Sequence, residues 1–275
     1  MTKEQNDLSF LGHLEILRWT LIRSALSVLV VGSVAFMMKD FIFNKIILLP
    51  KDASFITYRF LCSVSKQFGT QGLCIDQIPF IVQSRTMAGQ FSAHIWTSIT
   101  AGFILAFPFI LWEIWKFIKP GLYPKERKNA KSFIIISSFL FFLGVLFGYY
   151  VITPLSINFL GAYRVADEVH SNIDLSSYIG LLRASVLSAG LIFEMPIIIY
   201  FLTKMGLVTP EFLKKYRKYA LVLVLILSAL ITPPDVISQI IVAIPMMILY
   251  QVSIAISRVI IRKEEKAKAA LEKIK

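Results

Sequence analysis

The chain has 275 residues, of which 56% are hydrophobic, and its formal net charge is +12. Soluble globular domains use about 45–50% apolar residues, so this composition excludes an ordinary soluble domain. The Lys and Arg residues are spread over several short segments between apolar runs. This distribution favours contact with a membrane surface and argues against nucleic-acid binding.

Six apolar runs predict an all-α polytopic membrane protein with six transmembrane helices. A helix needs about 20 residues to cross a hydrocarbon core of about 30 Å, and most of the runs are near that length. The fifth run is shorter and Pro245 interrupts the sixth, so we expect the last two spans to be short. The predicted spans are 21–38, 92–118, 132–153, 178–203, 218–232 and 238–257.

The positions of Lys and Arg predict that both termini face the cytoplasm, because short cytoplasmic loops carry an excess of these residues. Cations gather near the N-terminus, after spans two and four, and in the tail, whereas the loop after span three has only Arg164. The external loop after span one, about residues 39–91, is too long to count. We therefore expect one six-helix membrane domain, residues 1–257, followed by a basic cytoplasmic tail, residues 258–275.

Both cysteines, Cys62 and Cys74, fall in the predicted external loop. An oxidising compartment would permit a disulfide between them, and two unpaired thiols are the alternative. No His lies close to them in the sequence, so we expect no metal site there. The histidines of the chain are scattered, which argues against a catalytic cluster.

Glu194 and Asp235 fall in or beside predicted spans. Glu194, in GLIFEMPIIIYF, lies about 24 Å along the helix from the outer end of span four. A carboxyl group in a bilayer marks either a polar cleft or partner contact, or a neutral side chain at a kink, which Pro196 would favour. Asp235 follows Thr232 in the spacing of a helix cap, so a structural role is expected for it.

A lone carboxylate, Glu126, lies among six cations between Lys116 and Lys131, in FIKPGLYPKERKNA and its flanks. It suits the first turn of a helix that begins at the preceding proline. It could equally form an anionic site together with Glu15, which lies in the amphipathic segment 8–24 at the same membrane face. Two glutamates there could each bind a guanidinium group through paired hydrogen bonds, a geometry that Lys does not offer. The aromatic residues of WEIWKF suit a membrane interface, and Glu113 between them is expected to have no special role.

Four stretches resemble, in order, the TatC family, the multispanning receptor of the twin-arginine protein-export system. They are HLEILRWTLIRS, PFILWEIWKFIKPGLYPKERK, FEMPIIIYFLTKMGLVTPEFLKKYRKY and LITPPDVISQIIVAIPMMILYQVSI. The resemblance implies that Glu126 binds the twin-arginine motif of a signal peptide, with Phe117 and Tyr123 at neighbouring positions. It further implies intramembrane polar or partner-helix contacts for Glu194 and Gln239.

The remaining family positions are a structural turn and the N-terminal motif. Pro234 and Asp235 match the turn before the last span. The family pattern H-L-x-E-L-R places a glutamate two residues before Arg18, where this chain has Ile16, and its carboxylate, Glu15, comes one residue earlier. One residue on a helix is a rotation of about 100°, so the resemblance supports Glu126 more directly than Glu15.

The resemblance implies a receptor and core subunit of a translocase in the cytoplasmic (inner) membrane, not an enzyme and without a cofactor. It would bind twin-arginine signal peptides of folded precursors and export them with single-span TatA/TatB-type subunits, driven by the proton gradient, and it would self-associate. The alternative is a secondary transporter or proton-coupled channel that uses Glu194. Such folds usually contain internal repeats, and the sequence shows none.

Overall fold

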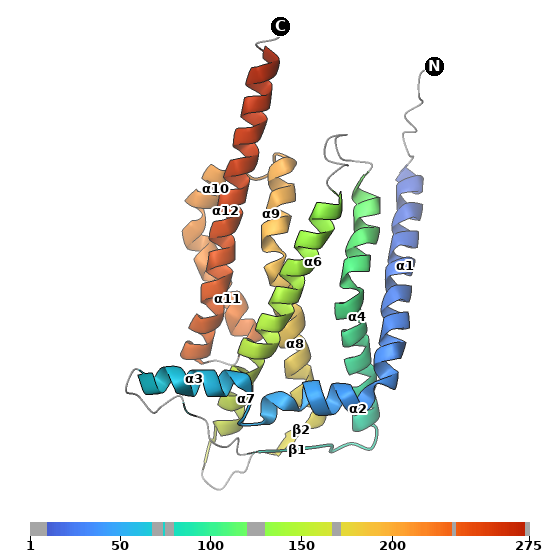
Figure 1. The fold of residues 1–275 in the computed structure, drawn as a ribbon, viewed down its shortest axis with the longest axis vertical. Helices are drawn as coiled ribbons and strands as arrows, with labels where there is room; N and C mark the ends of the chain where they lie inside the picture. The colour runs from blue at the N-terminus through green and yellow to red at the C-terminus, as the bar shows by residue number, and fades with distance from the viewer. Residues whose placement is uncertain are drawn as a thin grey trace. The chain divides into compact units, whose positions relative to one another are not determined.

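The computed structural model describes residues 10–67, 74, 80–119, 130–166, 172–232 and 235–272. Most of these residues are helical, and they include one short two-stranded sheet (Figure 1). The chain forms two compact units, Met1–Ile42 with Phe91–Phe139, and Phe43–Gln90 with Leu140–Lys275. The expected division into a membrane domain, residues 1–257, and a tail stays a prediction. No helix boundary falls at residue 258, because the last described helix continues to Glu272.

The first unit is built on a closely packed helix pair. A Cβ atom added to Gly102 would lie 2.6 Å from the carbonyl oxygen of Val28 and 2.8 Å from the Cα of Gly32, so the two backbones touch at this point. Small residues at such crossings are typical of helix pairs in membranes. The helices of this unit are α1 (Phe10–Met37), α2 (Lys39–Ile42), α4 (Gly89–Ile118) and the first part of α6 (Ala130–Phe147).

The second unit contains the rest of α6 and the remaining described elements. A parallel pair of short strands aligns Ile81 with Asn172 and Gln83 with Asp174. The elements are η1 (Phe43–Ile47), η2 (Leu49–Lys51), α3 (Ile56–Gln67), β1 (Ile81–Gln83), η4 (Gly148–Ile152), α7 (Thr153–Ala162), β2 (Asn172–Asp174), α8 (Leu175–Phe193), α9 (Met195–Lys204), α10 (Pro210–Lys215), α11 (Arg217–Ile231) and α12 (Val236–Glu272).

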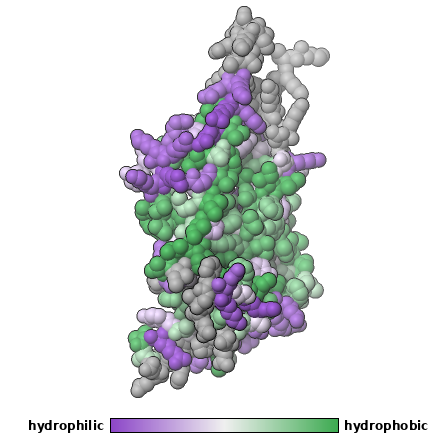
Figure 2. All heavy atoms as spheres, turned by 60° about the vertical axis from the view of Figure 1, so that its left-hand side comes forward, coloured by the Kyte–Doolittle hydropathy of each residue, from purple (hydrophilic) through white to green (hydrophobic). Residues whose placement is uncertain are grey.

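Two apolar clusters form the core of this second unit. One joins Ile152 and Ala189 to α11 and α12 through Val224, Val242 and Met246. The other lies where α9, α10 and α12 meet and consists of Ile199, Leu213, Tyr250 and Ile254. On the face that carries α10, α11 and α12, Figure 2 shows a broad apolar band between two polar ends. An outer surface of this kind is what a bilayer-spanning bundle presents to lipid.

Among the described helices, five stretches are long and apolar enough to cross a membrane. They are Leu14–Met37, Gly89–Ile118, Lys131–Ala162, Leu175–Lys204 and Ser238–Lys263. The predicted fifth span corresponds to α11, whose 15 residues are about 22 Å long as a helix. Six spans, and the side of the membrane on which the termini lie, therefore stay predictions.

The third and the last predicted spans end later in the structure than the sequence suggested. The expectation that the last span is short is wrong, because α12 continues through Pro245 and its apolar stretch has 26 residues. Proline is tolerated inside such helices, where neighbouring groups compensate for the missing hydrogen bond. The third span continues past residue 153 through the π-helical turn η4 into α7. The hydroxyl of Thr153 donates to the carbonyl of Gly148 at 2.8 Å, so a side chain adds a hydrogen bond to the backbone of that turn.

Contact between α6 and α8 depends on glycine. A Cβ atom added to Gly144 would lie 2.6 Å from the carbonyl oxygen of Ala189 and 2.8 Å from the Cα of Gly190. Both are backbone atoms that cannot rotate away. We expect Gly144→Ala to lower stability by about 1–3 kcal/mol, as overpacking usually does, measured as a lower thermal unfolding midpoint in detergent.

Gly180 provides the matched control for this prediction. It lies in α8, the helix that Gly144 of α6 contacts, but a Cβ atom added to Gly180 meets no atom within 4 Å. Gly180→Ala should leave the midpoint unchanged or raise it, because alanine loses less backbone entropy in a helix. Equal midpoints for the Gly144 and Gly180 variants would contradict the close approach of α6 and α8.

Candidate functional site

Three residues of the predicted site, Glu126, Tyr123 and Pro234, lie outside the described residues. The others divide between the two units. Glu15, Arg18 and Phe117 belong to the first unit, and Glu194, Asp235, Gln239, Cys62 and Cys74 belong to the second.

The segment around Glu15 is helical, because α1 begins at Phe10. Glu15 and Ile16 therefore point in directions about 100° apart on this helix, as expected from their spacing. Glu15 is exposed, whereas Ile16 is half-buried. Arg18, three residues after Glu15 and on the same side of α1, is exposed too, and its guanidinium lies 5.8 Å from the centre of the Trp19 ring.

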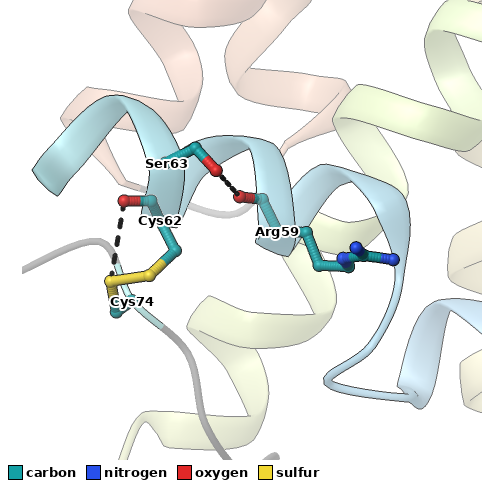
Figure 3. The surroundings of a disulfide bond; sticks show 4 residues. All are labelled: Arg59, Cys62, Ser63 and Cys74. Atoms are coloured by element: carbon teal, nitrogen blue, oxygen red, sulfur yellow. Dashed lines mark hydrogen bonds between the residues drawn. A yellow bond between two sulfur atoms is a disulfide. The ribbon is translucent and has the colours of Figure 1, made fainter. Parts of the chain in front are cut away.

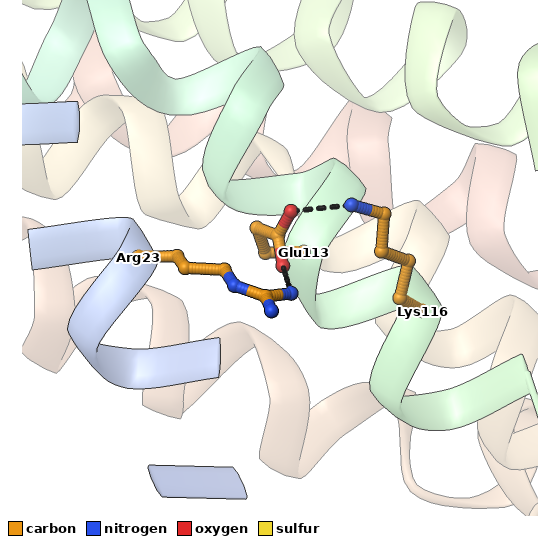
Figure 4. A network of polar contacts seen from close by, with 3 residues as sticks. All are labelled: Arg23, Glu113 and Lys116. Atoms are coloured by element: carbon orange, nitrogen blue, oxygen red, sulfur yellow. Dashed lines mark hydrogen bonds and ion pairs between the residues drawn. The ribbon is translucent and has the colours of Figure 1, made fainter. Parts of the chain in front are cut away.

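The first unit contains a buried carboxylate, Glu113, for which the sequence predicted no special role. Glu113, in α4, is 2% exposed, and its two carboxylate oxygens face different cations (Figure 4). Lys116, one turn further along α4, binds Oε1, and Arg23 of α1 lies 3.6 Å from Oε2. Both cations are about half exposed, so the carboxylate is covered while its partners reach solvent or headgroups.

The Glu113 cluster, defined as Arg23, Glu113 and Lys116, joins α1 to α4 near the last turn of α4, where half-buried Phe117 lies. The ammonium group of Lys116 also lies 5.8 Å from the centre of the Trp112 ring. The sequence could have indicated the pair of Glu113 and Lys116, because residues three apart are neighbours on a helix. The pair of Arg23 and Glu113 depends on how α1 packs against α4.

Glu194 lies at the junction between α8 and α9 and is 8% exposed. Its backbone (φ −73°, ψ −8°) interrupts the helix, and its carbonyl oxygen accepts from the N–H groups of Ile197 and Ile198. Pro196 follows as one of the first residues of α9, which is the break that the sequence suggested. The Glu194 side chain makes no capping hydrogen bond to α9.

Asp235 and Gln239 stabilise the start of α12. The Asp235 carboxylate accepts from the backbone N–H of Ser238 at 2.8 Å and so caps the helix. The structural role expected for Asp235 is thus present, but Thr232 belongs to the end of α11, where its hydroxyl donates to the carbonyl of Ser228. The Gln239 amide donates to the carbonyl of Leu225 at 3.0 Å, which joins α12 to α11.

Segments of the second unit that precede its long helices are joined by a disulfide and by buried tyrosines. Cys62 of α3 is bonded to Cys74, with an S–S distance of 1.98 Å (Figure 3). The Tyr58 hydroxyl lies 3.0 Å from the carbonyl oxygens of both Pro50 and Pro154. Burial raises the pKa of this hydroxyl well above its usual value, so it stays a neutral donor.

Asp174 joins the strand pair β1 and β2 to α8. Its carboxylate accepts from the N–H of Ser176 at 2.9 Å and from the N–H of Arg85 at 3.1 Å. These hydrogen bonds stabilise the ionised carboxylate and lower the pKa of Asp174, the bond from Ser176 more than the bond from Arg85. Arg85 in turn donates to the carbonyl of Asn172 at 2.7 Å. The beginning of α8 is therefore held to the strand pair.

The chain is similar to one family of known proteins along most of its length. The family model described as Sec-independent protein translocase protein (TatC) matches residues 12–245. A TatC protein of Blattabacterium sp. subsp. Periplaneta americana is 42% identical over 266 residues, which is 96% of this chain and 100% of the relative. The TatCy protein of Bacillus subtilis is 43% identical over 171 residues, which is 62% of this chain and 66% of the relative.

Two solved structures have the same fold. One is described as the crystal structure of the twin arginine translocase receptor TatC, with a TM-score of 0.65 and 30% identity over 90% of this chain and 98% of that chain. The other, of the same receptor in DDM, has a TM-score of 0.68 and 31% identity over 89% of this chain and 99% of that chain.

A double-mutant cycle would measure the interaction between Arg23 and Glu113. We expect Glu113→Gln and Arg23→Gln each to lower the thermal unfolding midpoint in detergent. Because Arg23 is about half exposed and screened, the coupling should be only about 0.5–1 kcal/mol. The double variant should therefore shift the midpoint by less than the two single shifts together. Strict additivity would show that the two side chains do not interact.

Proposed function

The chain belongs to the TatC family of Sec-independent protein translocases, and we propose that it is the signal-peptide receptor and core subunit of a twin-arginine translocase. It binds twin-arginine signal peptides of folded precursors and exports these proteins across the cytoplasmic membrane. The observation that carries this proposal is the extent of the family match, residues 12–245, which includes Glu126 and both units. Because the family is one of protein translocases, we do not propose the alternative, a secondary transporter or proton-coupled channel that uses Glu194.

Glu126 is the residue that we assign to the arginine pair of the signal peptide. It is the lone carboxylate among six cations from Lys116 to Lys131, and neighbouring positive charge favours its ionised form. A carboxylate binds a guanidinium through two parallel hydrogen bonds, which distinguishes arginine from lysine. Phe117 and Tyr123, at neighbouring positions, would contact the peptide beside the arginine pair.

The Glu113 cluster supports this assignment through charge. An arginine pair that approaches the cytoplasmic ends of α1 and α4 meets other cations, and like charges repel. Glu113 neutralises part of the charge of Arg23 and Lys116 by binding both. Glu15 and Arg18 are exposed near the start of α1 and would have a secondary role, because Glu15 is turned away from the family position.

We assign to Glu194 a polar contact with a single-span partner subunit of the TatA/TatB type. The residue is the twentieth of the thirty-residue stretch Leu175–Lys204, so it lies inside the membrane. A buried carboxyl group at that depth is costly and is usually retained for function. Gln239 has a supporting role, because its amide holds α11 to α12. Further copies of the chain, and the proton gradient as the source of energy, complete the proposed translocase.

The signal-peptide site is tested by titrating a fluorescent peptide that carries Arg-Arg against the same peptide carrying Lys-Lys. We expect the wild type to prefer Arg-Arg. Glu126→Ala should weaken Arg-Arg binding by about 10- to 100-fold, which is the range for one lost charge-assisted pair. Binding of the Lys-Lys peptide should change much less.

Glu211→Ala is the matched control for this titration, because Glu211 is an exposed carboxylate of α10 in another basic segment. It should leave the Arg-Arg preference intact. Equal binding of both peptides, unchanged by Glu126→Ala, would overturn the receptor proposal and reduce Glu126 to a residue of a helix start.

Glu194 is tested by co-purification with a single-span partner subunit. Glu194→Ala should lose most of the bound partner, whereas Glu194→Gln should retain part of it, because an amide still forms hydrogen bonds. Ile198→Ala, one turn further along α9 at an exposed position, serves as the control. Full retention of the partner by Glu194→Ala would contradict the assigned contact.

A further inference from the structure

The helix α3 has three chemically distinct faces. At about 100° per residue, Ile56, Phe60 and Val64 fall on one flank, each one turn from the next. Arg59 and Lys66 fall on a second flank, about 110° around the helix from the first. The third face carries the buried residues Tyr58 and Ser65 and lies away from both flanks.

The rotation of α3 about its own axis is fixed within the second unit. The Tyr58 hydroxyl lies 3.0 Å from carbonyl oxygens on η2 and α7, and the disulfide of Cys62 attaches the same helix to Cys74 (Figure 3). Ser63 donates to the carbonyl of Arg59 at 2.9 Å, within the same helix. The two flanks therefore have fixed directions.

Two contacts with the third span show which flank faces the middle of the membrane. Thr57, next to the apolar flank, donates to the carbonyl of Tyr150, whereas Tyr58 reaches the carbonyl of Pro154. Since this span runs from Lys131 to Ala162, Tyr150 lies about one turn deeper in it than Pro154. The side of α3 that carries Thr57, Ile56 and Phe60 thus points toward the hydrocarbon.

The surroundings of this flank are apolar as well. Ile56 and Phe60 are 63% and 66% exposed. Thr57 joins α3 to Tyr150, which ends an exposed apolar stripe that Leu143 and Leu146 begin on the same span. The flank is therefore continuous with a surface that lipid covers, and this continuity identifies its occupant. Figure 1 shows α3 lying across the end of the helices of its unit instead of running along them.

We propose that α3 is a membrane-interface helix. Ile56 and Phe60 are inserted at the boundary between acyl chains and headgroups, in the leaflet at the Ala162 end of the third span. Arg59 and Lys66 lie among the headgroup phosphates and water. Helices with one apolar and one basic flank bind membrane surfaces in this orientation. The disulfide and Tyr58 set the angle at which the apolar flank meets the lipid.

Spin labels at single introduced cysteines test this proposal. The native cysteines are joined to each other, so an introduced thiol is the one that reacts. Phe60→Cys and Ile56→Cys report on the apolar flank, and Arg59→Cys and Lys66→Cys are matched controls at exposed positions on the basic flank of the same helix. The full chain is reconstituted in vesicles of phosphatidylcholine and phosphatidylglycerol. Collision rates are then measured with oxygen, which concentrates in hydrocarbon, and with a water-soluble nickel chelate.

The ratio of oxygen to nickel collisions should be several-fold higher at positions 56 and 60 than at positions 59 and 66. Equal ratios on both flanks would overturn the proposal, because α3 would then lie in water. Exclusion of both reagents from positions 56 and 60 would also overturn it, because a protein surface, such as a second copy of the chain, would cover the flank. Labelling of one thiol per chain verifies that the disulfide is intact in each variant.

Discussion

Backbone N–H and C=O groups inside a hydrocarbon layer have no water to bind, so they must bond to one another, and this constraint organises the whole chain. The apolar segments are helical, and each departure from a regular helix is compensated within the second unit. In the π-helical turn at Gly148–Ile152, Thr153 donates to the carbonyl of Gly148. At the α8–α9 junction, the carbonyl of Glu194 accepts from two N–H groups of the next helix.

Two buried carboxylates among the described residues have different surroundings. Glu113 binds two cations that remain partly exposed, so its burial is compensated within the first unit. Glu194 lies deep in a long apolar stretch, at the break between α8 and α9. The first arrangement stabilises the pairing of α1 and α4. The second is the place where we propose a contact with a partner subunit.

The predicted site could be recognised from the sequence where its residues act through their immediate neighbours. Asp235 caps α12 and Pro196 follows a helix break, as their spacing indicated, because caps and kinks depend on residues within one turn. Glu113 was missed because its partner Arg23 comes from α1, far away in the sequence. The ends of the third and last spans were misjudged because Pro154 and Pro245 do not break a helix whose neighbours compensate for the missing hydrogen bond.

The sequence by itself determined that the chain is a helical membrane protein, because span length and apolar composition are local properties that the bilayer selects. Its ordered motifs likewise determined the family. The tertiary structure decided which surfaces those helices share. The crossing of α1 and α4 at Gly102, the coverage of Glu113 and the rotation of α3 about its axis all depend on contacts between residues far apart in the sequence. Such contacts leave no periodic pattern in the sequence, because each one joins two particular residues and is not repeated along a helix.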